Sequence, residues 1–218
     1  MSYILNIDTS SEKTFICLSK NGDLLNKVID KSQNHSLSIH RSIDNLLINS
    51  GISINMLDAI AVAEGPGSYT GLRVGMATAK GLAYSLKIPL ITINSLLLLA
   101  MASKKKEENL LYSPMIDARR MEVFTALYDD SFNIIIPPTN MILNENYLSQ
   151  YKNNRLVFSG SGSIKIAEFY SGEAFFDYYP ELYDKFCYMS FQKFLQAQFS
   201  DLTYTEPLYI KPFYHSKS

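Results

Sequence analysis

The sequence has no tryptophan, two cysteines and three histidines among 218 residues. So few cysteines cannot form the disulfide framework of a small secreted protein, and Cys17 and Cys187 stand in apolar surroundings, so we expect both thiols to be reduced. The longest apolar run, "LLLLAMA" at 96–102, is far shorter than the ~20 residues that cross a bilayer. The N-terminus, "MSYILNIDTSS", lacks the basic region and apolar core of a signal peptide. We therefore expect a cytoplasmic protein with no membrane contact.

An excess of positive charge is also missing. The chain carries 20 Lys and Arg against 21 Asp and Glu, which gives a formal net charge of −1. Strong non-specific attraction to nucleic acid requires clustered Lys and Arg that displace counterions. Any contact with RNA must therefore be local or shared with a partner. With 47% hydrophobic and 19% charged residues, the composition is that of a globular protein that can bury a core.

Short β-prone runs at 3–8, 14–19 and 24–30 predict an opening three-stranded meander, and Asn21-Gly22 is a typical hairpin turn between the last two. A helix should follow, with Asn34 or Ser36 as its N-cap and Gly51 as its stop. The pattern then predicts a strand at 57–65, a helix at 72–86, a strand at 89–94 and a helix at 95–103.

The charged stretch "KKKEEN" at 104–109 is the best candidate for a domain boundary. Beyond it, three β-prone runs repeat the order of the opening meander. We expect strands at 110–118, 121–129 and 133–137, a weak helix at 144–151, a strand at 155–160, a short helix after the turn at 159–163, a strand at 174–179 and a helix at 184–199. The predicted organisation is an N-terminal lobe at 1–103, a linker at 104–109 and a C-terminal lobe at 110–218, whose end could pack back on the N-terminal lobe.

A glycine-rich turn in "AVAEGPGSYTGLRVGMATAKGLAYSL", at 61–86, looks like a nucleotide-binding loop. A Walker A loop needs a Lys-Ser/Thr pair after its last glycine, and none is present. The dinucleotide pattern G-x-G-x-x-G is missed by one residue, because Gly65, Gly67 and Gly71 are spaced G-x-G-x-x-x-G. A helix N-terminus could still hold an anion, but the pattern favours a tight turn between a strand and a helix.

The helix after this loop has two flanks with little side-chain bulk. Glycine inside a helix costs about 0.5–1 kcal/mol relative to alanine, so something must approach the backbone closely. The chain's own sheet would explain one flank, and a helix of another subunit would explain the second. The first flank comprises Gly71, Gly75, Ala79 and Ala83, and the second comprises Val74, Thr78, Gly81 and Ser85.

Motifs along nearly the whole chain resemble those of the bacterial TsaB (YeaZ) family of tRNA threonylcarbamoyladenosine biosynthesis proteins. They are "IDTSS", "NHS", "EGPGSYTGLRVGMATAKGLA", "DARRMEVFTALY", "GSGS" and "EPLYIKP". The resemblance implies an α/β fold of two lobes, as in actin, the sugar kinases and the chaperone ATPases, each lobe opening with a three-stranded meander. It also implies a role in support of the catalytic paralogue TsaD, which with the ATPase TsaE transfers a threonylcarbamoyl group to the adenosine beside the anticodon.

We therefore expect a non-catalytic scaffold subunit whose first two helices dock on a TsaD-type paralogue. When alone, the chain should pair with itself as a homodimer, and tRNA should be contacted only through the complex. The expected interface residues are His40, Gly71, Leu72, Gly75, Met76, Thr78, Ala79 and Ala83.

No catalytic, cofactor or metal site is expected. The catalytic paralogue should carry His-x-x-x-His on its first helix, whereas His35 and His40 are five positions apart here and would not converge on one ion. Ser10 in "DTSS" replaces the glycine of a phosphate turn, "DARR" at 117–120 replaces a second such turn, and "SGSGS" is only a weak adenosine-binding pattern. These residues should instead make local bonds, with Asp8 capping amides and the arginines binding carboxylates.

Two other functions remain as alternatives. An autonomous small-molecule kinase or ATPase of the same fold would need complete phosphate turns. A peptidase is a weaker hypothesis, because "HSLSIH" has no Glu between its histidines and no Ser, His and Asp triad is evident. The chain departs from the family in "LYIKP", where Lys211 replaces an Arg and loses its bidentate fork, and in the aromatic stretch at 174–191.

Overall fold

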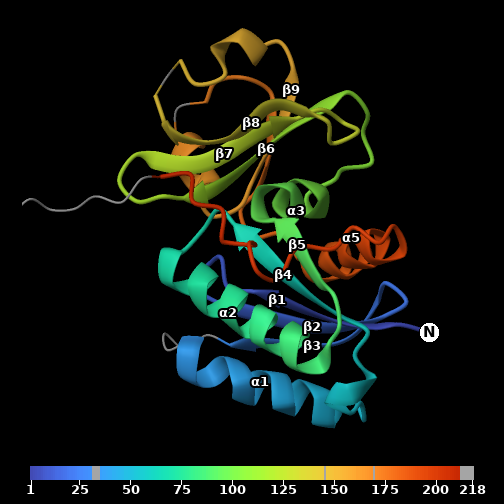
Figure 1. Cartoon of the computed structure of the whole chain (residues 1–218). Helices are drawn as coiled ribbons and strands as arrows, with labels where there is room; N and C mark the ends of the chain where they lie inside the picture. Colours follow the sequence, from blue (N-terminus) through green and yellow to red (C-terminus); the bar gives the residue numbers. More distant parts are fainter. Residues whose placement is uncertain (31–34, 145, 169, 212–218) are drawn as a thin grey trace, which may run out of the picture. The chain divides into compact units, whose positions relative to one another are not determined.

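Two five-stranded sheets with the same strand order make up the computed structural model (Figure 1). The structure describes residues 1–30, 35–144, 146–168 and 170–211, and only the backbone of 35–37. The first sheet has the order β3-β2-β1-β4-β5, and the second, read from its β8 edge, has the equivalent order β8-β7-β6-β9-β10. In each sheet an antiparallel meander of three strands is extended by two parallel strands. The predicted repeat of the opening meander is therefore confirmed.

The first sheet consists of β1 (Tyr3–Asp8), β2 (Thr14–Lys20), β3 (Asp23–Asp30), β4 (Ala59–Gly65) and β5 (Leu90–Asn94). The second consists of β6 (Leu110–Asp117), β7 (Glu122–Tyr128), β8 (Ile134–Ile142), β9 (Arg155–Ser159) and β10 (Ala174–Asp177). The helices are α1 (His35–Asn49), α2 (Tyr69–Leu86), α3 (Ser95–Ala102), α4 (Ser163–Ile166) and α5 (Tyr183–Leu195), with 3-10 turns η1 (Ile54–Met56) and η2 (Ser149–Tyr151).

Three elements differ from their predicted extents. The helix expected from Leu72 begins at Tyr69, because Ser68 acts as its N-cap. The strand expected to end at Pro137 continues to Ile142, which is possible because β8 is an edge strand and needs no amide from proline on its free side. The helix expected at 144–151 is reduced to the 3-10 turn η2. The candidate N-cap Asn34 lies outside the described residues.

The chain divides into two compact units. Unit 1 comprises Met1–Leu98 and Glu181–Pro207, and unit 2 comprises Leu99–Pro180 and the segment from Leu208. The expected linker at 104–109 thus lies inside unit 2. The last helix, expected in the C-terminal lobe, lies in unit 1 because α5 packs on β1, β2, β3 and β5.

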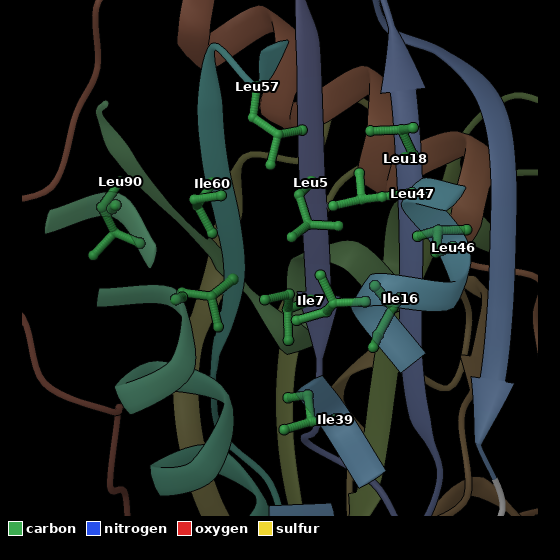
Figure 2. Packing of buried hydrophobic residues seen from close by; sticks show 14 of the residues in the cluster. Leu5, Ile7, Ile16, Leu18, Ile39, Leu46, Leu47, Leu57, Ile60 and Leu90 are labelled. Atoms are coloured by element: carbon green, nitrogen blue, oxygen red, sulfur yellow. The ribbon is translucent and has the colours of Figure 1, made fainter. Parts of the chain in front are cut away.

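Helices cover both faces of the unit 1 sheet, with α1 and α2 on one side and α5 on the other (Figure 1). The alternation along β2 explains this arrangement, since successive side chains point to opposite faces. Ile16 and Leu18 are buried in the core with α1, whereas Cys17 is buried in a cluster that includes Tyr183 of α5. Figure 2 shows the first of these cores, where side chains of β1 and β2 lie beside those of α1.

Unit 2 has a separate core between its sheet and the segments that cover it. The core contains Met115, Val123, Leu127, Leu156, Phe158 and Ile166, together with Tyr147. No helix in the described ranges combines the length and apolar character that a membrane span requires.

Candidate functional site

The glycine-rich loop between β4 and α2 is packed on the chain's own first turn, at the end of β1. The Ser68 amide donates to the Ser10 carbonyl at 2.7 Å, and the Gly71 amide donates to Ser68 Oγ at 3.4 Å. A Cβ at Gly67 would lie well under 3.0 Å from the Ser10 carbonyl oxygen. Two amides of this loop are therefore engaged, and an acceptor oxygen occupies the space above Gly67.

The glycines of α2 allow the same close approach along the helix. A Cβ at Gly71 would clash with the Thr9 carbonyl oxygen, and a Cβ at Gly75 would clash with Thr9 Oγ1. Thr9 is itself fully buried, and its Oγ1 has no hydrogen-bond partner. The first bare flank of the helix thus faces the end of β1. Packing within the chain therefore explains its small residues without a second subunit.

Seven of the eight expected interface residues are buried inside unit 1, and only His40 is exposed. The small residues of α2 were expected on an open surface, but they face the sheet. Their small size allows α2 to lie close to Thr9, where a larger side chain would clash. Leu72 and Met76 are 1% and 3% exposed, so neither can pack across an interface as the chain stands. The buried residues are Gly71, Leu72, Gly75, Met76, Thr78, Ala79 and Ala83.

The exposed stripe of α2 lies on the opposite side of the helix and consists of Arg73, Ala77, Gly81 and Tyr84. Gly81 has open space where a Cβ would be, and Tyr84 is 78% exposed. On the adjacent α1, Ile48 is 74% exposed and lies on the same helix as His40. Figure 1 shows α1 and α2 side by side on one face of the sheet.

Sequence reasoning identified only Gly81 of this stripe, as part of the second bare flank. In that flank, Val74 is half-buried, Thr78 is buried, and Gly81 and Ser85 are exposed, so it marks the border between the buried and exposed sides. The spacing of 73, 77, 81 and 84 was an available signal, since these positions follow one side of a helix. The sequence did not show whether that side of the helix faces solvent or the sheet.

Asp8 is buried at the first turn, where its Oδ1 accepts a hydrogen bond from the Ser10 amide at 2.8 Å. Burial raises the pKa of Asp8, and the hydrogen bonds from Ser10 oppose this shift. The carboxylate thus caps a backbone amide, as the sequence suggested.

In unit 2, the "DARR" hairpin is held by lysines. Lys165 Nζ lies 2.5 Å from Asp117 Oδ1, and Lys211 Nζ lies 2.8 Å from Glu122 Oε2. Arg119 and Arg120, expected to bind carboxylates, are exposed at the hairpin tip with φ values of 68° and 52°. The carboxylates of Asp117 and Glu122 are paired with lysines, and Arg120 contributes to Glu122 a longer-range attraction that helps to lower its pKa.

The "SGSGS" segment forms a packed turn between β9 and α4. The Gly162 amide donates to the Met115 carbonyl at 2.9 Å, and Gly160 has a φ of 86°. A Cβ at Gly162 would lie 2.9 Å from Val123 Cγ1. The glycines therefore allow close contact with β6 and β7 and close the turn. This agrees with the expectation that the motif makes local bonds rather than an adenosine site.

His35 and His40 are the histidines of the first helix. The side chain of His35 lies outside the described residues, and His40 is exposed on α1. Among the described residues, no group of three or more His, Cys, Asp and Glu side chains could hold a metal ion.

Comparisons with known proteins agree with the motifs and the fold. The family described as "TsaD: tRNA N6-adenosine threonylcarbamoyltransferase" matches residues 29–203. A relative from Bacillus subtilis (strain 168), named tRNA threonylcarbamoyladenosine biosynthesis protein TsaB, is 38% identical over 144 residues. The matched segment is 64% of this chain and spans 62% of the relative's length. The resemblance to TsaB proteins is thereby confirmed.

Solved structures show the same fold. The structure of YeaZ from Pseudomonas aeruginosa matches with a TM-score of 0.76 at 22% identity, over 96% of this chain and 100% of that chain. The ethanolamine utilization protein EutJ from Carboxydothermus hydrogenoformans matches with a TM-score of 0.54 at 8% identity, over 88% and 90% of the two chains. The predicted two-lobed α/β fold class is confirmed.

Proposed function

This chain belongs to the family of the tRNA N6-adenosine threonylcarbamoyltransferase TsaD, and from this premise we propose that it is a non-catalytic scaffold subunit in tRNA threonylcarbamoyladenosine synthesis. It would support a TsaD-type paralogue, which with a TsaE-type ATPase transfers the threonylcarbamoyl group to the adenosine beside the anticodon. The name of the Bacillus relative, a tRNA threonylcarbamoyladenosine biosynthesis protein, supports this pathway.

The observation that carries the non-catalytic part of the proposal is the packing of the loop after β4. Its Ser68 amide is bound by the Ser10 carbonyl, and the space above Gly67 is filled by the same oxygen. A bound phosphate needs amide donors rather than carbonyl oxygens around it. Phosphate binding at this loop would therefore require the first turn to separate from it.

The surface proposed to dock on the TsaD-type paralogue is the exposed side of α1 and α2. It is formed by His40, Ile48, Arg73, Ala77, Gly81 and Tyr84. Gly81 would allow a partner helix to approach closely, and Tyr84 and Ile48 supply apolar area of the kind found at interface centres. The buried small residues of α2 would act beneath this surface by setting the position of the helix.

The test is reconstitution from purified components. The chain alone should hydrolyse ATP and transfer threonylcarbamoyl only at background rates, and addition of the TsaD-type paralogue, the TsaE-type ATPase and an unmodified tRNA transcript should give the modified nucleoside. Omission of the chain should abolish most of that product. Turnover by the chain alone that persists after repeated purification would contradict the proposal.

A variant separates scaffold from enzyme more sharply. Asp8→Asn keeps the size of the side chain and an acceptor for the Ser10 amide but removes the carboxylate. If the chain is a scaffold, the reconstituted rate should change by no more than a few-fold, provided that circular dichroism shows a folded chain. Loss of activity of a hundredfold or more in a folded variant would assign Asp8 a chemical role.

A further inference from the structure

The two cysteines of the chain, which are 170 residues apart in sequence, are neighbours in unit 1. Cys17 lies on β2 and Cys187 on α5, and their Sγ atoms are 3.6 Å apart. Both are free thiols, and their exposed fractions are 2% and 0%. Since the sequence holds only these two cysteines, their contact is a specific product of the fold.

The pair lies in an apolar layer between the sheet and α5. Tyr183 and the partly buried Phe15 and Leu24 pack around it, and the rings of Phe15 and Tyr183 meet edge to face at 5.9 Å. The Asn6 side-chain amide lies 3.9 Å from Cys187 Sγ. The sulfur atoms thus stand at the contact that joins α5 to the sheet.

We propose that Cys17 and Cys187 are a redox modification site, at which a low-molecular-weight disulfide oxidises the two thiols to one intramolecular disulfide between β2 and α5. One protein thiolate attacks the oxidant and releases its first thiolate. The second protein thiolate then attacks the mixed disulfide, forms the Cys17–Cys187 bond and releases the other. The two protein thiols lose two protons and two electrons, and the oxidant becomes two thiols.

The fold makes this bond more favourable than it is in the unfolded chain. A disulfide bond is about 2.05 Å long, so the sulfur atoms must approach by roughly 1.5 Å from their present contact. In an unfolded chain, closing a loop between positions 170 residues apart has a large entropic cost. The folded chain already holds the two sulfurs together, so the disulfide should be more stable in the folded chain than in the unfolded one.

Formation of the bond should be slow. The oxidant reaches the buried sulfurs only when α5 separates transiently from β2. Contact with the Cys187 thiol and burial raise the pKa of Cys17, and the carboxylates of Asp8 and Asp184 act in the same direction. The reactive thiolate is therefore scarce at neutral pH, and the rate should rise with pH. This slowness is compatible with a reduced resting state.

The test compares the disulfide equilibrium in folded and unfolded chains. The full chain is brought to equilibrium in buffers of oxidised and reduced glutathione, under native conditions and in concentrated urea. Free thiols are then alkylated, and the mass of the intact chain is measured by mass spectrometry. The equilibrium constant for the intramolecular disulfide should be larger in the native chain, by a factor on the order of a thousand. An equal or smaller native constant, or native products that are only glutathione adducts or linked dimers, would overturn the proposal.

Cysteine variants and thermal unfolding test the same proposal independently. Cys17→Ser and Cys187→Ser should not form the product that lacks two hydrogen atoms. Circular dichroism checks that each variant is folded, and Cys187→Ala replaces Cys187→Ser if the serine variant does not fold. The oxidised native chain should melt several degrees above the reduced chain, and dithiothreitol should reverse the shift. A lower melting temperature after oxidation would mean that the fold resists the bond, which contradicts the proposal.

Discussion

Single glycines of α2 have opposite surroundings although they lie on one helix. Gly75 faces Thr9, whose Oγ1 occupies the space that a Cβ would need, whereas nothing lies within 4 Å of a Cβ at Gly81. The first glycine is required by contact between the helix and the end of β1. Gly81 has no such constraint within the described structure, so a partner could approach the helix backbone closely at this position.

Alanine substitutions should separate these two roles. Gly75→Ala should destabilise the chain by about 1–3 kcal/mol, because the added methyl group overpacks the contact with Thr9. Gly81→Ala should leave stability unchanged or raise it by up to about 1 kcal/mol, because alanine favours an exposed helix. Urea denaturation followed by circular dichroism measures both. Equal effects of the two substitutions would contradict the assignment of the buried side.

Between elements, one ion pair ties the C-terminal segment of unit 2 to its sheet. Glu122 on β7 accepts a hydrogen bond from Asn140 of β8 at 2.7 Å and pairs with Lys211 at 2.8 Å. Lys211 provides a single ammonium group, which cannot form the bidentate fork that an Arg offers to a carboxylate. The bonds from Lys211 and Asn140 lower the pKa of Glu122 below its usual value of 4.5.

This ion pair should make stability depend on pH. Because the folded pKa of Glu122 is lowered, its ionised form stabilises the fold above pH 4.5, and the contribution disappears as the pH falls through the folded pKa. Glu122→Gln should therefore be less stable than the parent at about pH 7, and the difference should shrink as the pH falls below the usual pKa of Glu122, as measured by urea denaturation. The exposed Glu108→Gln is the matched control, and a deficit of Glu122→Gln that is independent of pH would argue against the ion pair.

At the scale of the whole molecule, the proposed association uses one surface for two partners. A surface that pairs with itself about a two-fold axis is self-complementary. The exposed side of α1 and α2 would serve for a homodimer when the chain is alone and for the TsaD-type paralogue when that is present. The two complexes would then compete.

Ala77→Glu should weaken both complexes while the chain stays folded, because it puts a charge in the centre of the proposed surface. Tyr188→Glu is the control, since Tyr188 is 49% exposed on α5. Sedimentation velocity should show a dimer for the parent and the control and a monomer for Ala77→Glu, and added paralogue should replace the homodimer with a heterodimer. A dimer that Ala77→Glu leaves intact would place the interface elsewhere.

The sequence by itself determined the strands, the repeated meander and the structural role of the glycine-rich turn, because alternation, turn residues and the spacing of small side chains are local properties. It also showed that α2 has two flanks with little side-chain bulk, to which a sheet or a helix of another subunit could come close. Which of these flanks packs on the chain itself depended on Thr9, more than sixty positions away, and no local pattern carries that contact. Only the tertiary structure placed α5 in unit 1 and brought Cys17 to Cys187, since apolar burial favours many pairings of elements and the packing of the whole unit selects among them.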